Sequence, residues 1–184
     1  MIGLIASILA AITLGNPVFL LTAPIYALRL KDRNAALIGF YAYTIILTTT
    51  LPNTSIYESP GLKMAIIASL STILTLDEIL RGPKLNKETL TTSGILTATA
   101  LNDYTLMLTL TGTTLYTTYK NFGKATTYFT GWLTGSATLL YLTKDKLPDP
   151  AAQALVIIGL GLAFLLIAER KEVKLLEVNL REKN

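Results

Sequence analysis

The side chains of this sequence that could carry chemistry are few and lie scattered among long apolar stretches. The chain contains no His and no Cys, which excludes His-dependent acid–base catalysis, thiolate zinc sites, iron–sulfur clusters, histidine-ligated haem and disulfides. What remains are single charged or amide side chains within or beside apolar blocks, namely Lys63, Asp77, Glu78, Asp103 and Gln153. Polar side chains in such surroundings are costly and often functional, so these are the candidate residues of an ion path or of polar packing between helices.

The charged candidates also have simple structural explanations. Asp77 and Glu78 precede Arg81 by four and three residues, a spacing at which helical side chains form ion pairs. Lys63 can extend its ammonium group toward water along its flexible stem. Asp103 falls at an expected turn between two helices, where solvent accounts for its charge. No cluster resembles a nucleophile with its base or a set of metal ligands, so the sequence predicts neither a catalytic centre nor a cofactor.

The elements that must position these side chains are expected to be α-helices in a membrane. Of the residues, 51% are hydrophobic and 15% are charged, whereas soluble domains have about 25% charged residues. The charges cluster in short separators between apolar blocks, a pattern typical of a polytopic helical membrane protein. The blocks fall at about residues 3–30, 35–51, 61–80, 89–101, 104–119, 125–143 and 151–168. Asn16-Pro17 interrupts the first block, and the proline predicts a kink there.

The distribution of basic residues indicates how many helices to expect. Residues 89–119 would form either one helix of roughly 46 Å, longer than a hydrocarbon core of about 30 Å, or two short helices. With seven helices and the N-terminus outside, the cytoplasmic side receives 13 of the 16 basic residues, whereas six helices give a split of 8 and 8. The sequence therefore predicts an all-α, polytopic transmembrane bundle of seven helices with a cytoplasmic C-terminus.

We expect the chain to be organised in three segments. They are a set of N-terminal transmembrane helices, a three-helix unit and a cytoplasmic tail, over residues 1–101, 102–171 and 172–184. In the tail, Val173, Leu176 and Leu180 follow a helical spacing, which fits an amphipathic helix on a surface and a solvated helix end equally well. Threonines are frequent inside the apolar blocks, and we expect them to bond within and between helices rather than to line a conduction path.

The last apolar block opens on a motif. Asp149-Pro150 begins it, Gln153-Ala154-Leu155-Val156 continues it, and basic residues end it. A proline in the first turn of a helix is favourable, and the preceding Asp can cap that helix. Together with the helix and basic turn before it, the segment 104–171 resembles the C component of the cation/proton antiporters that are built from several subunits, and the related K component of complex I. In that antiporter family an outside Asp-Pro-x-x-Gln-Ala-Leu-Val string opens the final helix.

The resemblance extends more loosely to the whole chain. It looks like the E component of membrane-bound formate-hydrogenlyase-type hydrogenases, in which further helices precede a K-like unit. The K components of complex I have intramembrane glutamates for proton transfer, whereas this sequence has no acid between 125 and 143. The antiporter C type, or a scaffold that completes a membrane arm, is therefore the better match. Gln153 could bond a neighbouring subunit or line a hydrated path, and both interpretations stay open.

The resemblance implies an accessory membrane-arm subunit of a complex-I-related ion-translocating assembly. Such an assembly is a membrane-bound hydrogenase, a related reductase or a cation/proton antiporter complex. The protein would have no catalytic centre or cofactor of its own, and would be a multi-pass protein of the cell membrane. Its expected partners are antiporter-like subunits and lipid, not nucleic acid. The alternative is a self-contained small-solute transporter or substrate-binding membrane component, which needs a convergent polar pocket. An enzyme acting on lipids would need more than the Asp77-Glu78 pair.

Overall fold

The computed structural model describes residues 1–82, 86–123, 125–147 and 149–167. In chain order its elements are α1 (Ile2–Leu14), η1 (Pro17–Leu21), α2 (Thr22–Lys31), α3 (Arg33–Thr50), α4 (Ser59–Arg81), α5 (Lys87–Thr99), α6 (Asp103–Phe122), α7 (Ala125–Leu142) and α8 (Pro150–Ile167). The expected all-α class is confirmed for this part of the chain. The expected division of residues 89–119 into two helices is also found, with α5 ending before α6 begins. The expected amphipathic tail, 172–184, lies outside the described residues.

Side-chain caps fix where several helices begin. At the start of α3, Asp32 accepts a hydrogen bond from the backbone N–H of Asn34 at 2.8 Å. At the start of α5, Asn86 accepts one from the backbone N–H of Thr89 at 2.7 Å. Such caps satisfy donors that have no partner inside the helix. The polar separators of the sequence therefore act as helix starts.

The first apolar block is not a single kinked helix. α1 ends at Leu14, and Gly15 follows in a left-handed conformation with φ 63°, which glycine adopts without a steric penalty. Asn16 then caps the 3-10 helix η1 by accepting a hydrogen bond from the backbone N–H of Val18 at 3.0 Å. The kink expected at Pro17 is thus a complete break, because the left-handed glycine ends the helix before the proline is reached.

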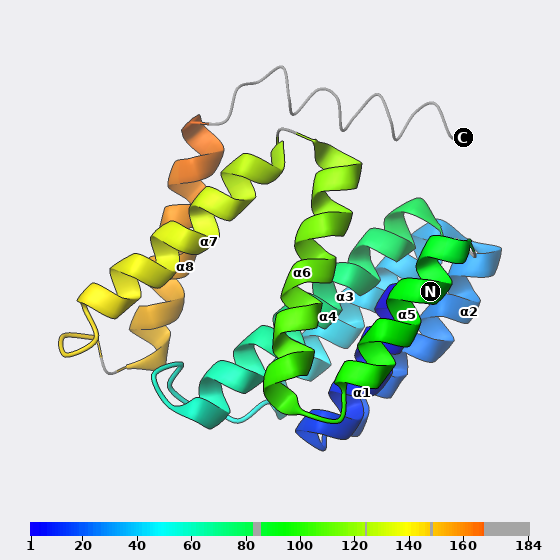
Figure 1. Ribbon diagram of the computed structural model, residues 1–184, viewed down its shortest axis with the longest axis horizontal. Coiled ribbons are helices and arrows are strands. Elements are labelled where there is room, and N and C mark those ends of the chain that lie inside the picture. The colour runs from blue at the N-terminus through cyan, green and yellow to red at the C-terminus, as the bar shows by residue number, and fades with distance from the viewer. Residues whose placement is uncertain (83–85, 124, 148, 168–184) are drawn as a thin grey trace. The chain divides into compact units, whose positions relative to one another are not determined.

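The chain divides into two compact units, residues 1–114 and 115–184, with the boundary inside α6. In the first unit α1 packs along α4, and α2 packs along α3 (Figure 1). The core of this unit is built mainly from α1, α3 and α4, and Leu96, Leu106 and Leu110 extend it to α5 and α6. In the second unit α7 and α8 lie side by side as a helical hairpin (Figure 1).

The contact between α1 and α4 is unusually close because small side chains line it. A Cβ built on Gly3 would lie 2.6 Å from the backbone N of Thr75 and 2.7 Å from the backbone of Leu74. The same approach brings Ser7 Oγ within 2.9 Å of Thr75 Oγ1 and the Gly3 carbonyl within 3.2 Å of it, although the shorter bond of the Thr75 hydroxyl is to the Ser71 carbonyl of its own helix at 2.8 Å. Ser7 and Thr75 are both fully buried. Small residues and buried hydroxyls therefore hold the two helices together.

The α7–α8 hairpin uses aromatic side chains against glycines. A Cβ on Gly131 would lie 2.9 Å from the Phe164 ring, and one on Gly161 would lie 3.2 Å from Trp132 Nε1. The Trp132 indole also donates a hydrogen bond to the carbonyl of Ile157 at 2.8 Å. Each helix thus has a glycine on which an aromatic ring of the other helix packs. The indole hydrogen bond fixes the register of α7 against α8.

Many threonine and serine hydroxyls bond back to their own helix. Thr48 and Thr49 donate to carbonyls three residues earlier, and Thr91 and Thr134 donate to carbonyls four residues earlier, at 2.7 to 2.9 Å. These side chains are exposed, so burial does not force the bond. Back-bonding of this kind satisfies the hydroxyl inside the helix. These threonines therefore bond within their own helices, in agreement with the expectation of local bonding.

The prediction of a polytopic transmembrane bundle of seven helices is wrong. Within the part of the chain that the structure describes, no helix has both the length and the hydrophobicity that a membrane span needs. Crossing takes about 20 consecutive apolar residues, whereas α1, α2 and α5 have 13, 10 and 13 residues. The longer α4 and α6 include charged side chains, and threonines dilute α3, α6 and α7. The expected sidedness, with the N-terminus outside and the C-terminus cytoplasmic, depended on this bundle and is therefore not supported.

Candidate functional site

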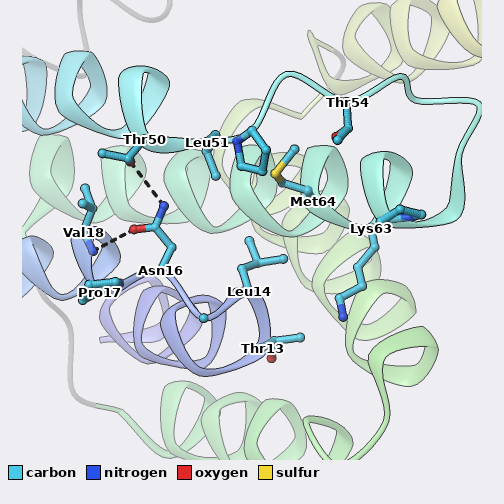
Figure 2. Close-up of a pocket in the computed structure, with 13 residues that line it drawn as sticks. Thr13, Leu14, Asn16, Pro17, Val18, Thr50, Leu51, Thr54, Lys63 and Met64 are labelled. Atoms are coloured by element: carbon cyan, nitrogen blue, oxygen red, sulfur yellow. Dashed lines mark hydrogen bonds between the residues drawn. The ribbon is translucent and has the colours of Figure 1, made fainter.

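The first unit contains a hollow of about 620 Å³ at the break between α1 and η1, a volume within the range of small-molecule sites. Leu14 to Val18 form one wall, and the end of α3 with the loop that follows it forms another (Figure 2). The first turns of α4 supply Pro60, Lys63 and Met64. The lining is mostly apolar, with a few amide, hydroxyl and ammonium groups at its edge.

Asn16 organises the polar edge of this hollow. Its side-chain oxygen accepts from the backbone N–H of Val18, and its Nδ2 donates to Thr50 Oγ1 at 3.2 Å (Figure 2). Thr50 in turn donates to the Leu47 carbonyl at 3.0 Å. One amide therefore starts η1 and ties it to the end of α3. The interruption at Asn16 is visible in the sequence, but its contact with a residue 34 positions away is not.

Lys63 is the charged group of the hollow, and it pairs with another candidate. Its Nζ lies 2.6 Å from Asp103 Oδ2, which joins the first turns of α4 to the start of α6. The side chains are 30% and 45% exposed, respectively, so solvent screens this ion pair. The sequence offered separate explanations for the two residues, solvent for Asp103 and an extended stem for Lys63. The structure brings them together across 40 positions.

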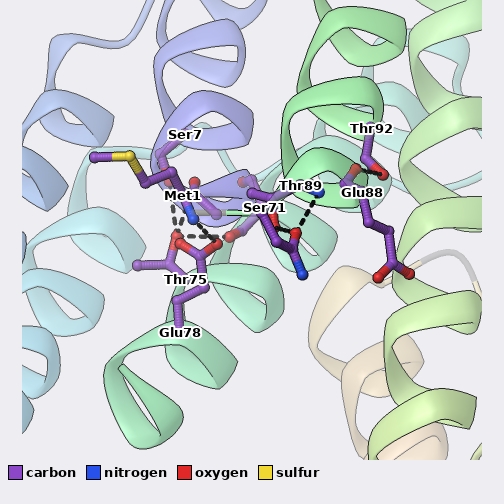
Figure 3. Close-up of polar contacts among 10 residues, drawn as sticks. Met1, Ser7, Ser71, Thr75, Glu78, Glu88, Thr89 and Thr92 are labelled. Atoms are coloured by element: carbon purple, nitrogen blue, oxygen red, sulfur yellow. Dashed lines mark hydrogen bonds and ion pairs between the residues drawn. The ribbon is translucent and has the colours of Figure 1, made fainter. Parts of the chain in front are cut away.

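Asp77 and Glu78 have different partners although they are neighbours in the sequence. Asp77 Oδ1 accepts from Arg81 Nε at 2.8 Å, the helical pairing expected from their spacing. Glu78 instead faces α1, where its Oε1 lies 2.5 Å from the amino group of Met1 (Figure 3). Its side chain is 13% exposed, beside the buried Ser7 and Thr75 contact. The two acids therefore point to different neighbours and do not form one site.

The motif residues lie at the start of α8, in the second unit. Asp149 Oδ1 accepts from the backbone N–H of Ala151 at 3.3 Å, and Pro150 is the first residue of the helix. Gln153 is 2% exposed, and its Nε2 donates to the carbonyl of Leu147 at 3.0 Å. Ala154 is exposed. Gln153 thus tethers the loop before α8 to the helix, whereas Asp149 serves as a cap.

In the described residues there is no group of three or more Asp and Glu side chains that could hold a metal ion. Burial raises the pKa of Tyr43 to about 12, and the neighbouring Thr72 side chain offsets only part of that rise. The Tyr43 hydroxyl therefore holds its proton more firmly than an exposed tyrosine does. The candidate residues themselves cap helices, pair with other groups or edge the hollow.

Comparison with known proteins adds no family. No family model, no curated protein and no solved structure matches this chain.

Proposed function

We propose that this protein is an accessory, non-catalytic subunit of the membrane arm of a complex-I-related ion-translocating assembly, where it packs against antiporter-like subunits and lipid. Its part in the assembly is structural. It fills the space between larger subunits, and the electron and ion chemistry belongs to them. The assembly is a membrane-bound hydrogenase, a related reductase or a cation/proton antiporter complex.

The observation that carries the proposal is the apolar surface that the helices leave uncovered. On α3, Ile38, Tyr41 and Ile45 are 72%, 66% and 66% exposed. On α8, Leu155, Ile158 and Leu162 are 70%, 57% and 59% exposed. Both triplets follow the spacing i, i+3, i+7, which places them on one face of each helix. Apolar stripes of this kind mark surfaces that another protein or lipid covers.

The resemblance of the C-terminal segment names the kind of partner. The string Asp149-Pro150 followed by Gln153-Ala154 resembles the opening of the final helix in the C components of the antiporters, and here it opens α8 of a helical hairpin. The stripe of Leu155, Ile158 and Leu162 begins directly after it. A helix with a fixed start and an uncovered apolar face suits a protein that packs against a longer neighbour.

The test is isolation of the tagged full chain from its own cells in a mild detergent, followed by identification of the proteins that remain bound after size-exclusion chromatography. We expect an antiporter-like subunit in stoichiometric amount. The variant Leu155→Glu should abolish this association, because it puts a charge on the apolar stripe. The matched control is Lys144→Gln, which changes the net charge equally at an exposed loop position and should leave the complex intact.

Two results would overturn the proposal. One is recovery of the wild-type chain alone, with no stoichiometric partner. The other is a Leu155→Glu complex as stable as the wild-type complex. Circular dichroism of each variant must show unchanged helix content, so that loss of association is not loss of fold.

A further inference from the structure

The hollow at the break between α1 and η1 places one cationic group at the edge of apolar walls. Leu14, Val18, Leu51 and Met64 supply apolar side chains to its lining, and Lys63 supplies the ammonium group. In Figure 2, Leu14 reaches from α1 toward α4, the sulfur end of Met64 is turned toward Leu51, and the Lys63 side chain extends from α4. A ligand that satisfies both features is apolar along its length and negatively charged at one end.

The Asn16 amide of the lining is already engaged within the protein. Asn16 already uses its amide oxygen on Val18 and its amide nitrogen on Thr50. Lys63 differs, because an ammonium group has three donors and Asp103 accepts from it at 2.6 Å. Its side chain is 30% exposed, so a second carboxylate can approach the same ammonium group from the hollow.

We propose that this hollow binds a single-chain amphiphile with a carboxylate head, such as a fatty acid, with the head on Lys63 and the chain against the apolar walls. The inference goes beyond the accessory role and does not depend on it. Asp103 sets the strength of binding, because its carboxylate competes with that of the ligand for the same ammonium group and repels it. The ion pair thus keeps Lys63 in place when no ligand is bound.

Substitutions of Asp103 and Lys63 are expected to change the affinity for the acid in opposite directions. Removing its charge in Asp103→Asn should tighten binding of the acid several-fold. Removing the cation in Lys63→Met should weaken it about tenfold, the size expected for a hydrogen bond to a charged group. The variant Lys63→Arg should keep most of the affinity. A neutral probe with the same chain should respond to none of these changes.

The experiment uses the full chain and decanoate carrying a diazirine group, with light-induced labelling mapped by mass spectrometry. The label should fall on α1, η1 and the first turns of α4. Unlabelled decanoate, decanol and dihexanoylphosphatidylglycerol are titrated as competitors, and the concentration of each that halves the labelling gives its relative affinity. Helix content and the midpoint of thermal unfolding are measured for every variant.

We expect decanoate to compete more strongly than decanol in the wild-type protein, with the order of variants Asp103→Asn, wild type, Lys63→Met from tight to weak. Equal competition by decanol, or an affinity for decanoate that Asp103→Asn leaves unchanged, would overturn the proposal by showing an apolar hollow without a head-group site. Stronger competition by the diacyl phospholipid would overturn the single-chain assignment. Labelling elsewhere on the chain would overturn the site.

Discussion

Replacing Gly3 with alanine is expected to weaken the close contact between α1 and α4 and so to lower the free energy of unfolding. The added Cβ would lie 2.6 Å from the Thr75 backbone nitrogen and 2.7 Å from the Leu74 carbonyl oxygen. Backbone atoms cannot rotate away as a side chain can, so α1 must shift. A shift also lengthens the buried hydrogen bonds from Thr75 to the Gly3 carbonyl and between Thr75 and Ser7.

Three effects set the change in the free energy of unfolding of the Gly3→Ala protein. Overpacking costs about 1–3 kcal/mol, and each weakened buried hydrogen bond costs about 1 kcal/mol. Against this, alanine favours a helix over glycine by about 0.5–1 kcal/mol. The free energy of unfolding should therefore fall by roughly 2–4 kcal/mol, which lowers the unfolding midpoint by about 5–15 °C for a chain of this length.

The matched control is Gly94→Ala in α5, where nothing lies within 4 Å of the built Cβ. Only the helix preference acts there, so the same chemical change should raise stability by about 0.5–1 kcal/mol. Both variants are measured by urea unfolding of the full chain followed by circular dichroism, with linear extrapolation to water. If Gly3→Ala were as stable as Gly94→Ala, the close approach of α1 and α4 would be refuted.

Two further substitutions test the buried polar contacts. Thr75→Val should lower the free energy of unfolding by about 1–3 kcal/mol, because the buried Ser7 hydroxyl loses its partner on α4. The control Thr97→Val removes a bond within one helix at an exposed position and should change this free energy by less than about 0.5 kcal/mol. Equal losses would contradict a stabilising contact between Ser7 and Thr75. Trp132→Phe should lower the free energy of unfolding by about 1–2 kcal/mol, because it removes the hydrogen bond to the Ile157 carbonyl. Urea unfolding measures this change, with Tyr141→Phe at a 78% exposed ring as the control. If the Trp132→Phe protein were as stable as the wild type, the indole would not stabilise the contact between α7 and α8.

The positions of the helices could be predicted well because local residues decide them. Asp32, Asn86 and Pro150 sit at helix starts, where a cap or a missing N–H is favourable. Residues 89–119 divide where Asn102 and Asp103 interrupt the apolar pattern. The prediction of membrane-spanning helices failed because it took the length of each apolar block as the length of a helix. Gly15 ended a helix inside a block, and the threonines made helices less apolar than the blocks suggested.

The partners of the candidate residues could not be predicted, because they lie far away in the chain. The spacing of Asp77 and Arg81 is local and gave the correct ion pair. Lys63 and Asp103 lie 40 positions apart and meet only in the folded first unit. The hollow depends on three segments that approach each other, and no spacing in the sequence encodes its volume. Gln153 could be placed near the start of a helix, but its bond to Leu147 requires the preceding loop to fold back.

The threonine hydroxyls that bond their own helices have a consequence for the surfaces of α3 and α7. A hydroxyl that already donates to a carbonyl of its own turn, as in Thr48, Thr49 and Thr134, needs no acceptor from outside. What such a residue shows a neighbour is its methyl group. Surfaces rich in threonine on α3 and α7 thus present themselves to a covering molecule much as alanine and valine would. Contact with such a surface would depend on matching shape more than on matching polar atoms.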